Sequence, residues 1–163
     1  MRRISTLLCL LGLLLVALVI FRIDRIVFAD TSTPISIVSF GSPVTENFNT
    51  LASSLTSSTT PPGWGFVESG TNANTTYTAG NGSGNSGDTY SFGATGNSER
   101  AFGGLQSGSL VPTLGAVFTN NTGGTIGSVT ISYTGEQWRL GTSGRTDRID
   151  FQISTNATSL TTG

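Results

Sequence analysis

Apolar and polar residues alternate along two segments in the last third of the chain. The first spans residues 129–141, with Val129, Ile131 and Tyr133 spaced by two, and the second spans residues 147–154. A two-residue period is typical of strands with one buried face. The pattern therefore predicts that the two segments pair as the central hairpin of the fold.

Shorter segments of the same kind precede this hairpin and predict further strands. They lie at residues 31–39, 64–68, 75–79, 88–93, 99–105 and 110–118. Pro112 interrupts the last of them, which predicts an edge strand or two short strands. Residues 120–124 predict a tight hairpin loop, because Asn and Gly tolerate positive φ. About nine or ten short strands at this spacing indicate an all-β fold, an antiparallel and jelly-roll-like β-sandwich.

Composition supports short strands joined by turns. Glycine accounts for 22 of the 163 residues, and charged residues make up only 10% of the chain. Regularly spaced aromatic and β-branched residues argue against disorder. The glycine-rich segment 80–87 is interpreted as a connecting loop, since a phosphate-binding loop would need a helix N-terminus or a lysine behind it.

The first 29 residues have the pattern of a secretory signal peptide in helical form. Two arginines precede a 15-residue apolar run from Leu7 to Phe21, and Ala29 precedes the expected cleavage point. The alternative is an uncleaved membrane anchor, because residues 4–21 are 18 residues long, at the lower limit for a membrane span. The expected domains are therefore 1–29, a signal peptide or N-terminal membrane anchor, and 30–163, a β-sandwich. We expect a protein that is secreted or displayed on the cell surface.

Charge in the mature part argues against an anionic partner. Residues 30–163 contain four arginines, no lysine and eight acids, which leaves a net charge of −4. This balance predicts no nucleic-acid partner and no contact with an anionic membrane surface. Arg139, Arg145 and Arg148 lie near acidic residues of the central hairpin, and the expected arrangement is a local network of ion pairs.

The chain has few of the residue types that catalysis usually needs. It contains no histidine, and its only cysteine, Cys9, lies inside the apolar run of the signal. The mature part therefore lacks the residues for Ser-His-Asp or Cys-His catalysis and for the usual zinc sites. We predict no catalytic residues, no metal site and no cofactor.

Two functional interpretations remain open. Trp64, Trp138 and Arg139 are candidate ligand-binding residues, with the indole rings as stacking platforms for sugars or, alternatively, as core side chains. Glu136 could face Asp147 or Asp150 across the hairpin, and Glu136 with Asp150 is the candidate acid-base pair of a remnant extracellular hydrolase, although nearby arginines favour a structural role for these acids. Asp88 and Asp150 could supply oxygen ligands to calcium, but no loop of fixed acidic spacing supports such a site.

Several motifs resemble a β-sandwich module of bacterial secreted proteins. The resemblance covers residues 44–160 and rests on Phe48-Asn-Thr-Leu51, Pro61-Pro-Gly-Trp-Gly-Phe66, residues 89–93, residues 100–109, residues 118–123 and Ile131-Ser-Tyr-Thr-Gly-Glu-Gln-Trp-Arg139. In that family the module lies near the N-terminus of larger exported proteins, some with a C-terminal sorting signal and some with nuclease, phosphatase or lamin-tail-like domains.

The resemblance implies a non-catalytic module with an interaction or spacer role. Its partner would be a polysaccharide or a cell-envelope protein, and membrane contact would involve only residues 4–21 of an uncleaved signal. Family members continue past the position of Gly163 with further strands, which implies that this chain is a fragment whose sandwich is incomplete at the C-terminus. No catalytic residue is assigned to the module.

Overall fold

The chain is built from β-strands. The computed structural model describes residues 26–28, 33–144 and 146–161, so the signal prediction for residues 1–29 lies almost entirely outside the described residues. Nine strands and no helix are found in this part: β1 (Ile26–Phe28), β2 (Ile35–Ile37), β3 (Thr56–Ser57), β4 (Trp64–Ser69), β5 (Tyr77–Gly80), β6 (Asp88–Phe92), β7 (Ala101–Leu105), β8 (Val111–Ala116) and β9 (Phe118–Asn120). In the same residues, no helix has the length and apolar character that crossing a membrane requires.

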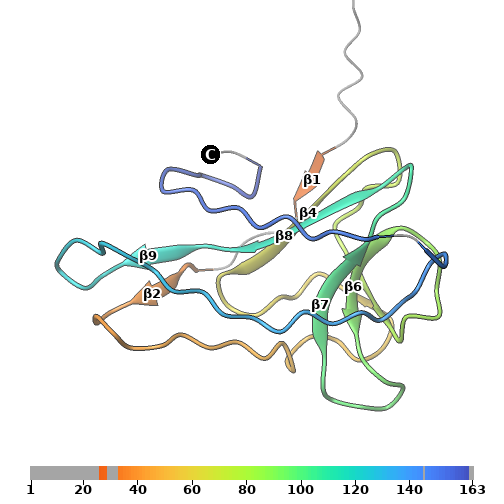
Figure 1. Cartoon of the computed structure of the whole chain (residues 1–163), viewed down its shortest axis with the longest axis horizontal. Helices are drawn as coiled ribbons and strands as arrows, with labels where there is room; N and C mark the ends of the chain where they lie inside the picture. The colour runs from red at the N-terminus through yellow and green to blue at the C-terminus, as the bar shows by residue number, and fades with distance from the viewer. Residues whose placement is uncertain (1–25, 29–32, 145, 162–163) are drawn as a thin grey trace, which may run out of the picture.

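The strands form three sheets of mixed direction (Figure 1). One sheet is antiparallel with the order β1-β4-β8, and the β4–β8 register runs from Trp64 opposite Ala116 to Ser69 opposite Val111. A second sheet has the order β3-β5-β6-β7, in which β5 and β6 are parallel and the outer pairs are antiparallel. The third sheet is the short parallel pair of β2 and β9. The fold is thus all-β, with both parallel and antiparallel pairs.

Aromatic side chains fill the space between the two larger sheets. Phe66 of β4 makes edge-on contacts with Tyr77 of β5 and Phe102 of β7, at centroid distances of 6.0 and 6.1 Å. Tyr77 and Phe102 lie 6.0 Å apart, so the three rings form a closed triangle. Leu51 joins this cluster from a loop, and Phe66 and Tyr77 are fully buried. Burial of these rings stabilises the contact between the sheets.

Most of the predicted strands are confirmed. The segments predicted at 64–68, 75–79, 88–93 and 99–105 correspond to β4, β5, β6 and β7. The prediction of an edge strand at Pro112 is also correct, because β8 lies at the edge of its sheet, but the break between β8 and β9 falls at Val117 and Pro112 lies inside the β4–β8 ladder. A proline is tolerated at an edge because its missing N–H leaves no broken ladder bond inside the sheet.

The prediction of a central hairpin is wrong. The described residues between 121 and 158 contain no strand, although the chain there is extended and crosses the face of the sheets (Figure 1). The rings of Tyr133 and Phe151 stack at a centroid distance of 6.3 Å. The two segments therefore meet through these side chains, and no backbone ladder joins them within the described residues. The loop at 120–124 does form, with Thr122 N–H donating to Asn120 Oδ1 at 3.1 Å, but no strand returns from it.

Candidate functional site

The segment around Arg139 docks onto the glycine-rich loop between β5 and β6. The guanidinium Nη1 donates to the carbonyl oxygens of Gly84 at 2.8 Å, Ser83 at 3.2 Å and Gly82 at 3.5 Å. Three carbonyl dipoles that converge on one cation hold the loop and the segment together. The loop thus acts through its acceptors, and the ion pairs predicted for Arg139 are not formed within the described residues.

Trp138 extends a stack of aromatic rings at this site. Its ring lies 6.2 Å from that of Phe92 and almost parallel to it, and Phe92 stacks on Tyr90 at 4.9 Å. The indole Nε1 donates to Glu136 Oε2 at 2.8 Å. Trp138 is half-buried, so it both packs on β6 and retains an exposed part. Glu136 fixes the plane of the indole, which is the preorganisation that a stacking platform requires.

Gly82 sets the distance between the loop and this segment. Its φ is +81°, and a Cβ atom added there would overlap the carbonyl oxygen of Trp138. We expect Gly82→Ala to displace residues 136–139 and to lower the free energy of unfolding by about 1–3 kcal/mol, since both strain and steric overlap oppose it. Chemical denaturation followed by tryptophan fluorescence measures both effects.

Gly96→Ala is the matched control for this change. Gly96 has a similar φ of +77°, but no atom lies within 4 Å of the position of an added Cβ. The control contains the backbone strain alone, so its loss of stability should be the smaller one. Equal losses in the two variants would show that the approach of Trp138 to Gly82 contributes nothing.

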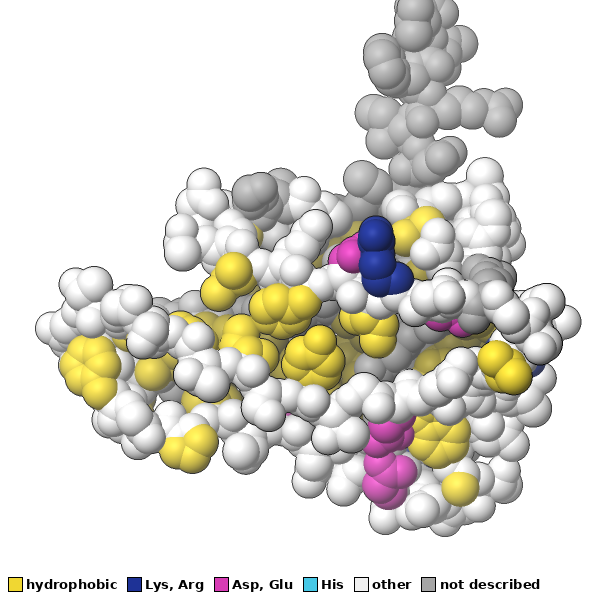
Figure 2. All heavy atoms as spheres, viewed as in Figure 1, with side chains coloured by type: hydrophobic (Ala, Val, Ile, Leu, Met, Phe, Trp, Pro, Cys, Tyr) yellow, Lys and Arg dark blue, Asp and Glu magenta, His cyan; other side chains and the backbone are white. Residues whose placement is uncertain are grey.

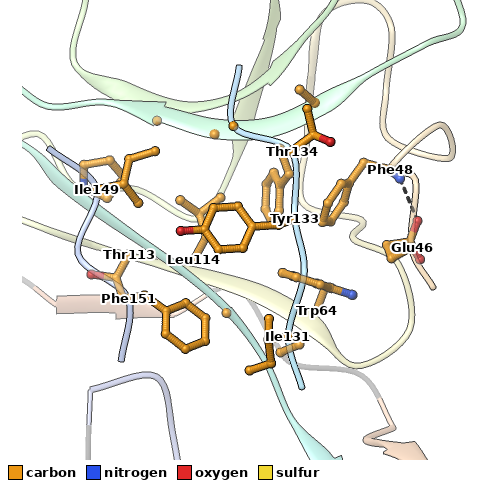
Figure 3. A pocket seen from close by; sticks show the side chains of 18 of the residues that line it. Glu46, Phe48, Trp64, Thr113, Leu114, Ile131, Tyr133, Thr134, Ile149 and Phe151 are labelled. Atoms are coloured by element: carbon orange, nitrogen blue, oxygen red, sulfur yellow. Dashed lines mark hydrogen bonds between the residues drawn. The ribbon is translucent and has the colours of Figure 1, made fainter. Parts of the chain in front are cut away.

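An open groove runs from this site along the face of the sheets. Trp64 of β4 and Leu114 of β8 form its floor, Ile131 and Tyr133 line one wall, and Phe151 lines the other (Figure 3). Hydrophobic side chains gather along the hollow on this face of the molecule (Figure 2). The groove has a volume of about 4000 Å³. Pockets for small ligands measure roughly 300–1,000 Å³, so this open groove is larger than a small-ligand pocket.

Two aromatic groove residues were not among the predicted site residues. Tyr133 is 67% exposed and Phe151 is 57% exposed, and their stacked rings project into the groove. Their alternation with polar residues had indicated strand faces that would be buried in a sheet. The signal was the two-residue period itself, which marks an apolar face without stating what covers it.

Trp64 lies in the groove floor but is mainly a packing residue. Its ring contacts that of Phe48 edge-on at a centroid distance of 4.7 Å, and the Phe48 ring lies 5.7 Å from that of Phe102. The indole Nε1 is buried and has no hydrogen-bond partner among the described residues. The structure thus separates the predicted residues: Trp138 and Arg139 act together at the glycine-rich loop, and Trp64 belongs to the aromatic cluster near the core.

The two carboxylates of the hydrolase interpretation have different partners. Asp150 forms an ion pair with Arg148 at 2.8 Å, with side chains that are 63% and 80% exposed, and Glu136 is engaged by the indole of Trp138. Among the described residues no hydrogen bond joins Glu136 to Asp150. The Arg148–Asp150 pair confirms part of the predicted ion-pair network, whereas Arg145 lies outside the described residues.

Asp88 and Asp150, the residues considered as calcium ligands, have separate surroundings. Asp88 accepts the hydroxyl of Thr78 at 2.6 Å, while Asp150 binds Arg148. In the part of the chain that the structure describes, no three side chains of the types Asp, Glu, His or Cys are grouped as metal ligands would be.

Comparison of this chain with protein-family models, with curated proteins and with solved structures finds no match.

Proposed function

We propose that this protein is a non-catalytic β-sandwich module, secreted or displayed on a bacterial cell surface, that binds a polysaccharide in the open groove. The observation that supports this most directly is the exposure of Tyr133 and Phe151 in a groove larger than a small-ligand pocket. Sugar rings present C–H faces that stack on aromatic rings, and their hydroxyls need polar groups at the rim. One end of the groove has an aromatic ring from Trp138 and polar groups from Glu136 and Arg139.

A neutral or weakly charged chain is the expected ligand. Two arginines that line the groove already have partners: Arg148 binds Asp150, and Arg139 binds the loop carbonyls. Since these charges are satisfied, ring stacking and hydroxyl contacts would dominate binding. The same arrangement supports a non-catalytic role, because exposed carboxylates next to arginine or indole donors are poorly placed to hold a proton for catalysis.

Affinity electrophoresis against a panel of polysaccharides tests the proposal. With a ligand in the gel, the wild-type protein should be retarded. We expect Tyr133→Ala to lose about 2 kcal/mol of binding energy, roughly a 30-fold rise in Kd, because a stacking platform in the groove centre would be removed.

Leu55→Ala is the control, since Leu55 is 83% exposed and does not line the groove. It should migrate like the wild type at every polysaccharide concentration. The proposal fails if no glycan retards the wild type. It also fails if Tyr133→Ala and Leu55→Ala bind equally well, whereas capture of an envelope protein through Tyr133 would indicate the protein-binding alternative.

A further inference from the structure

Two carboxylates from different sheets converge on one backbone N–H. Glu68 of β4 is fully buried, and its Oε1 accepts both the N–H of Thr89 at 2.8 Å and the Thr89 hydroxyl at 2.7 Å. The same Thr89 N–H also donates to Asp88 Oδ1 at 2.9 Å. Thr89 and Asp88 belong to β6, so this cluster connects the sheet of β4 with the sheet of β6.

The remaining donors are too few to neutralise two ionised acids. Glu68 Oε2 accepts the N–H of Asn74 at 3.0 Å, and Asp88 Oδ2 accepts the hydroxyl of Thr78 at 2.6 Å. All of these donors are uncharged. Two carboxylates held together without a cation repel each other, and a proton shared between them removes the repulsion and adds a hydrogen bond.

In the described part of the chain, no arginine pairs with Glu68 or Asp88 to neutralise their charge. Arg139 faces Tyr90 and the loop carbonyls, and Arg100 donates to Ser91 and Gly80. Burial raises the pKa of Tyr90, and the negative charge of Asp88 raises it further, while Arg139 lowers it. No ionisable side chain of β5 or β7 forms a hydrogen bond with Glu68 or Asp88 among the described residues.

We propose that Glu68 and Asp88 hold one proton between β4 and β6, and that loss of this proton loosens the contact between the two sheets. The proton is carried by Asp88, whose carboxyl group then donates to the Glu68 carboxylate. The fold would thus contain an acid-stabilised clamp, a property independent of any ligand in the groove.

The direction of the pH effect follows from the Asp88 carboxyl. Burial raises its pKa, hydrogen bonds from Thr78 and Thr89 oppose the shift, and the hydrogen bond and charge of Glu68 raise the pKa further. The folded state therefore binds this proton more tightly than the unfolded chain does. The stabilisation is fully present below the ordinary aspartate value of about 3.9, and it is lost as the pH rises through the folded pKa.

Urea unfolding of wild-type protein and Asp88→Asn between pH 4 and pH 8 tests the clamp. The urea midpoint of the wild type should fall as the pH rises. An asparagine amide donates to Glu68 at every pH, so the midpoint of the variant should not show this fall. At pH 7.5 its unfolding midpoint in urea should exceed that of the wild type, because the raised pKa of Asp88 no longer favours the folded wild type once the proton is lost.

Asp150→Asn is the matched control, because it makes the same change at an exposed acid paired with Arg148. It should keep the wild-type pH profile. The proposal is overturned if Asp88→Asn retains that profile, or if it is destabilised equally at pH 4.5 and pH 7.5.

A measurement on the wild type covers the case in which Asp88→Asn does not fold. The carboxyl carbon of Asp88 and the amide proton of Thr89 are followed by NMR from pH 3 to pH 8. We expect both signals to titrate together, with a midpoint above the ordinary aspartate value. Titration of Asp88 at or below that value would overturn the proposal.

Discussion

Replacing Phe66 with alanine is expected to lower the free energy of unfolding by about 3–5 kcal/mol, the usual cost of removing a buried aromatic ring. Phe66 is fully buried and touches both Tyr77 and Phe102, which come from two strands of the opposite sheet. Its removal leaves a cavity where the sheets meet and deprives the other two rings of an edge-on partner. Chemical denaturation gives the loss as a fall in midpoint at constant slope.

Phe40→Ala provides the control for ring removal. The Phe40 side chain is 62% exposed and lies in a loop, so its loss should change the free energy of unfolding by less than about 1 kcal/mol. If the two variants lose similar stability, the aromatic triangle is not the main contact between the sheets. A change in denaturation slope for Phe66→Ala would indicate a different effect, partial uncoupling of the sheets.

Local patterns predicted the strands that pair with other strands. The alternation of Trp64, Phe66 and Glu68 places these three side chains on one face of β4, and the structure confirms the strand. The burial of Glu68 could not be read from the pattern, because a carboxylate is normally excluded from a core. Its partners, Thr89 and Asn74, come from other segments and become visible only in the folded chain.

The alternation at 129–135 is as regular as that at 64–68, but it gives no strand. A strand needs a neighbour for its backbone N–H and C=O groups, and the two-residue period contains no information about that neighbour. Ile131 and Ile149 remain 49% and 78% exposed. The pattern therefore identified an apolar face correctly, but the prediction that this face is buried in a sheet was wrong.

The candidate site was predicted in part for the same reason. Trp138 is a predicted site residue because an indole ring can serve as a stacking platform for sugars. The contact of Arg139 with Gly82 and Gly84 joins residues 57 and 55 positions apart, and no local pattern specifies it. The glycine-rich loop is a connection, as predicted, and it contacts Arg139 through carbonyl acceptors, whereas a phosphate-binding loop would act through its N–H donors.

Arg100 presents a buried cation that is bound by uncharged acceptors. Only 3% of the residue is exposed, and Nε donates to Ser91 Oγ at 2.8 Å. Nη2 donates to the carbonyl of Ser91 and, at 3.4 Å, to the carbonyl of Gly80. Gly80 ends β5 and Ser91 lies in β6, so one side chain fastens the end of the parallel pair. No acid forms an ion pair with Arg100 among the residues that the structure describes.

Arg100→Lys is expected to lower the free energy of unfolding by about 2–4 kcal/mol, because an ammonium group cannot reproduce the planar fork and leaves buried carbonyls without donors. Arg100→Met should cost a similar amount, since it keeps the apolar stem and removes every donor. Arg148→Met, at an exposed ion pair, should change stability by less than about 1 kcal/mol. Urea denaturation at one pH distinguishes the cases.

If lysine restored wild-type stability while methionine did not, charge alone would be sufficient at position 100 and the forked geometry would be unnecessary. If both Arg100 variants were as stable as the wild type, the end of the β5–β6 pair would be held by backbone hydrogen bonds, such as that from Gly93 N–H to the Gly80 carbonyl at 3.0 Å.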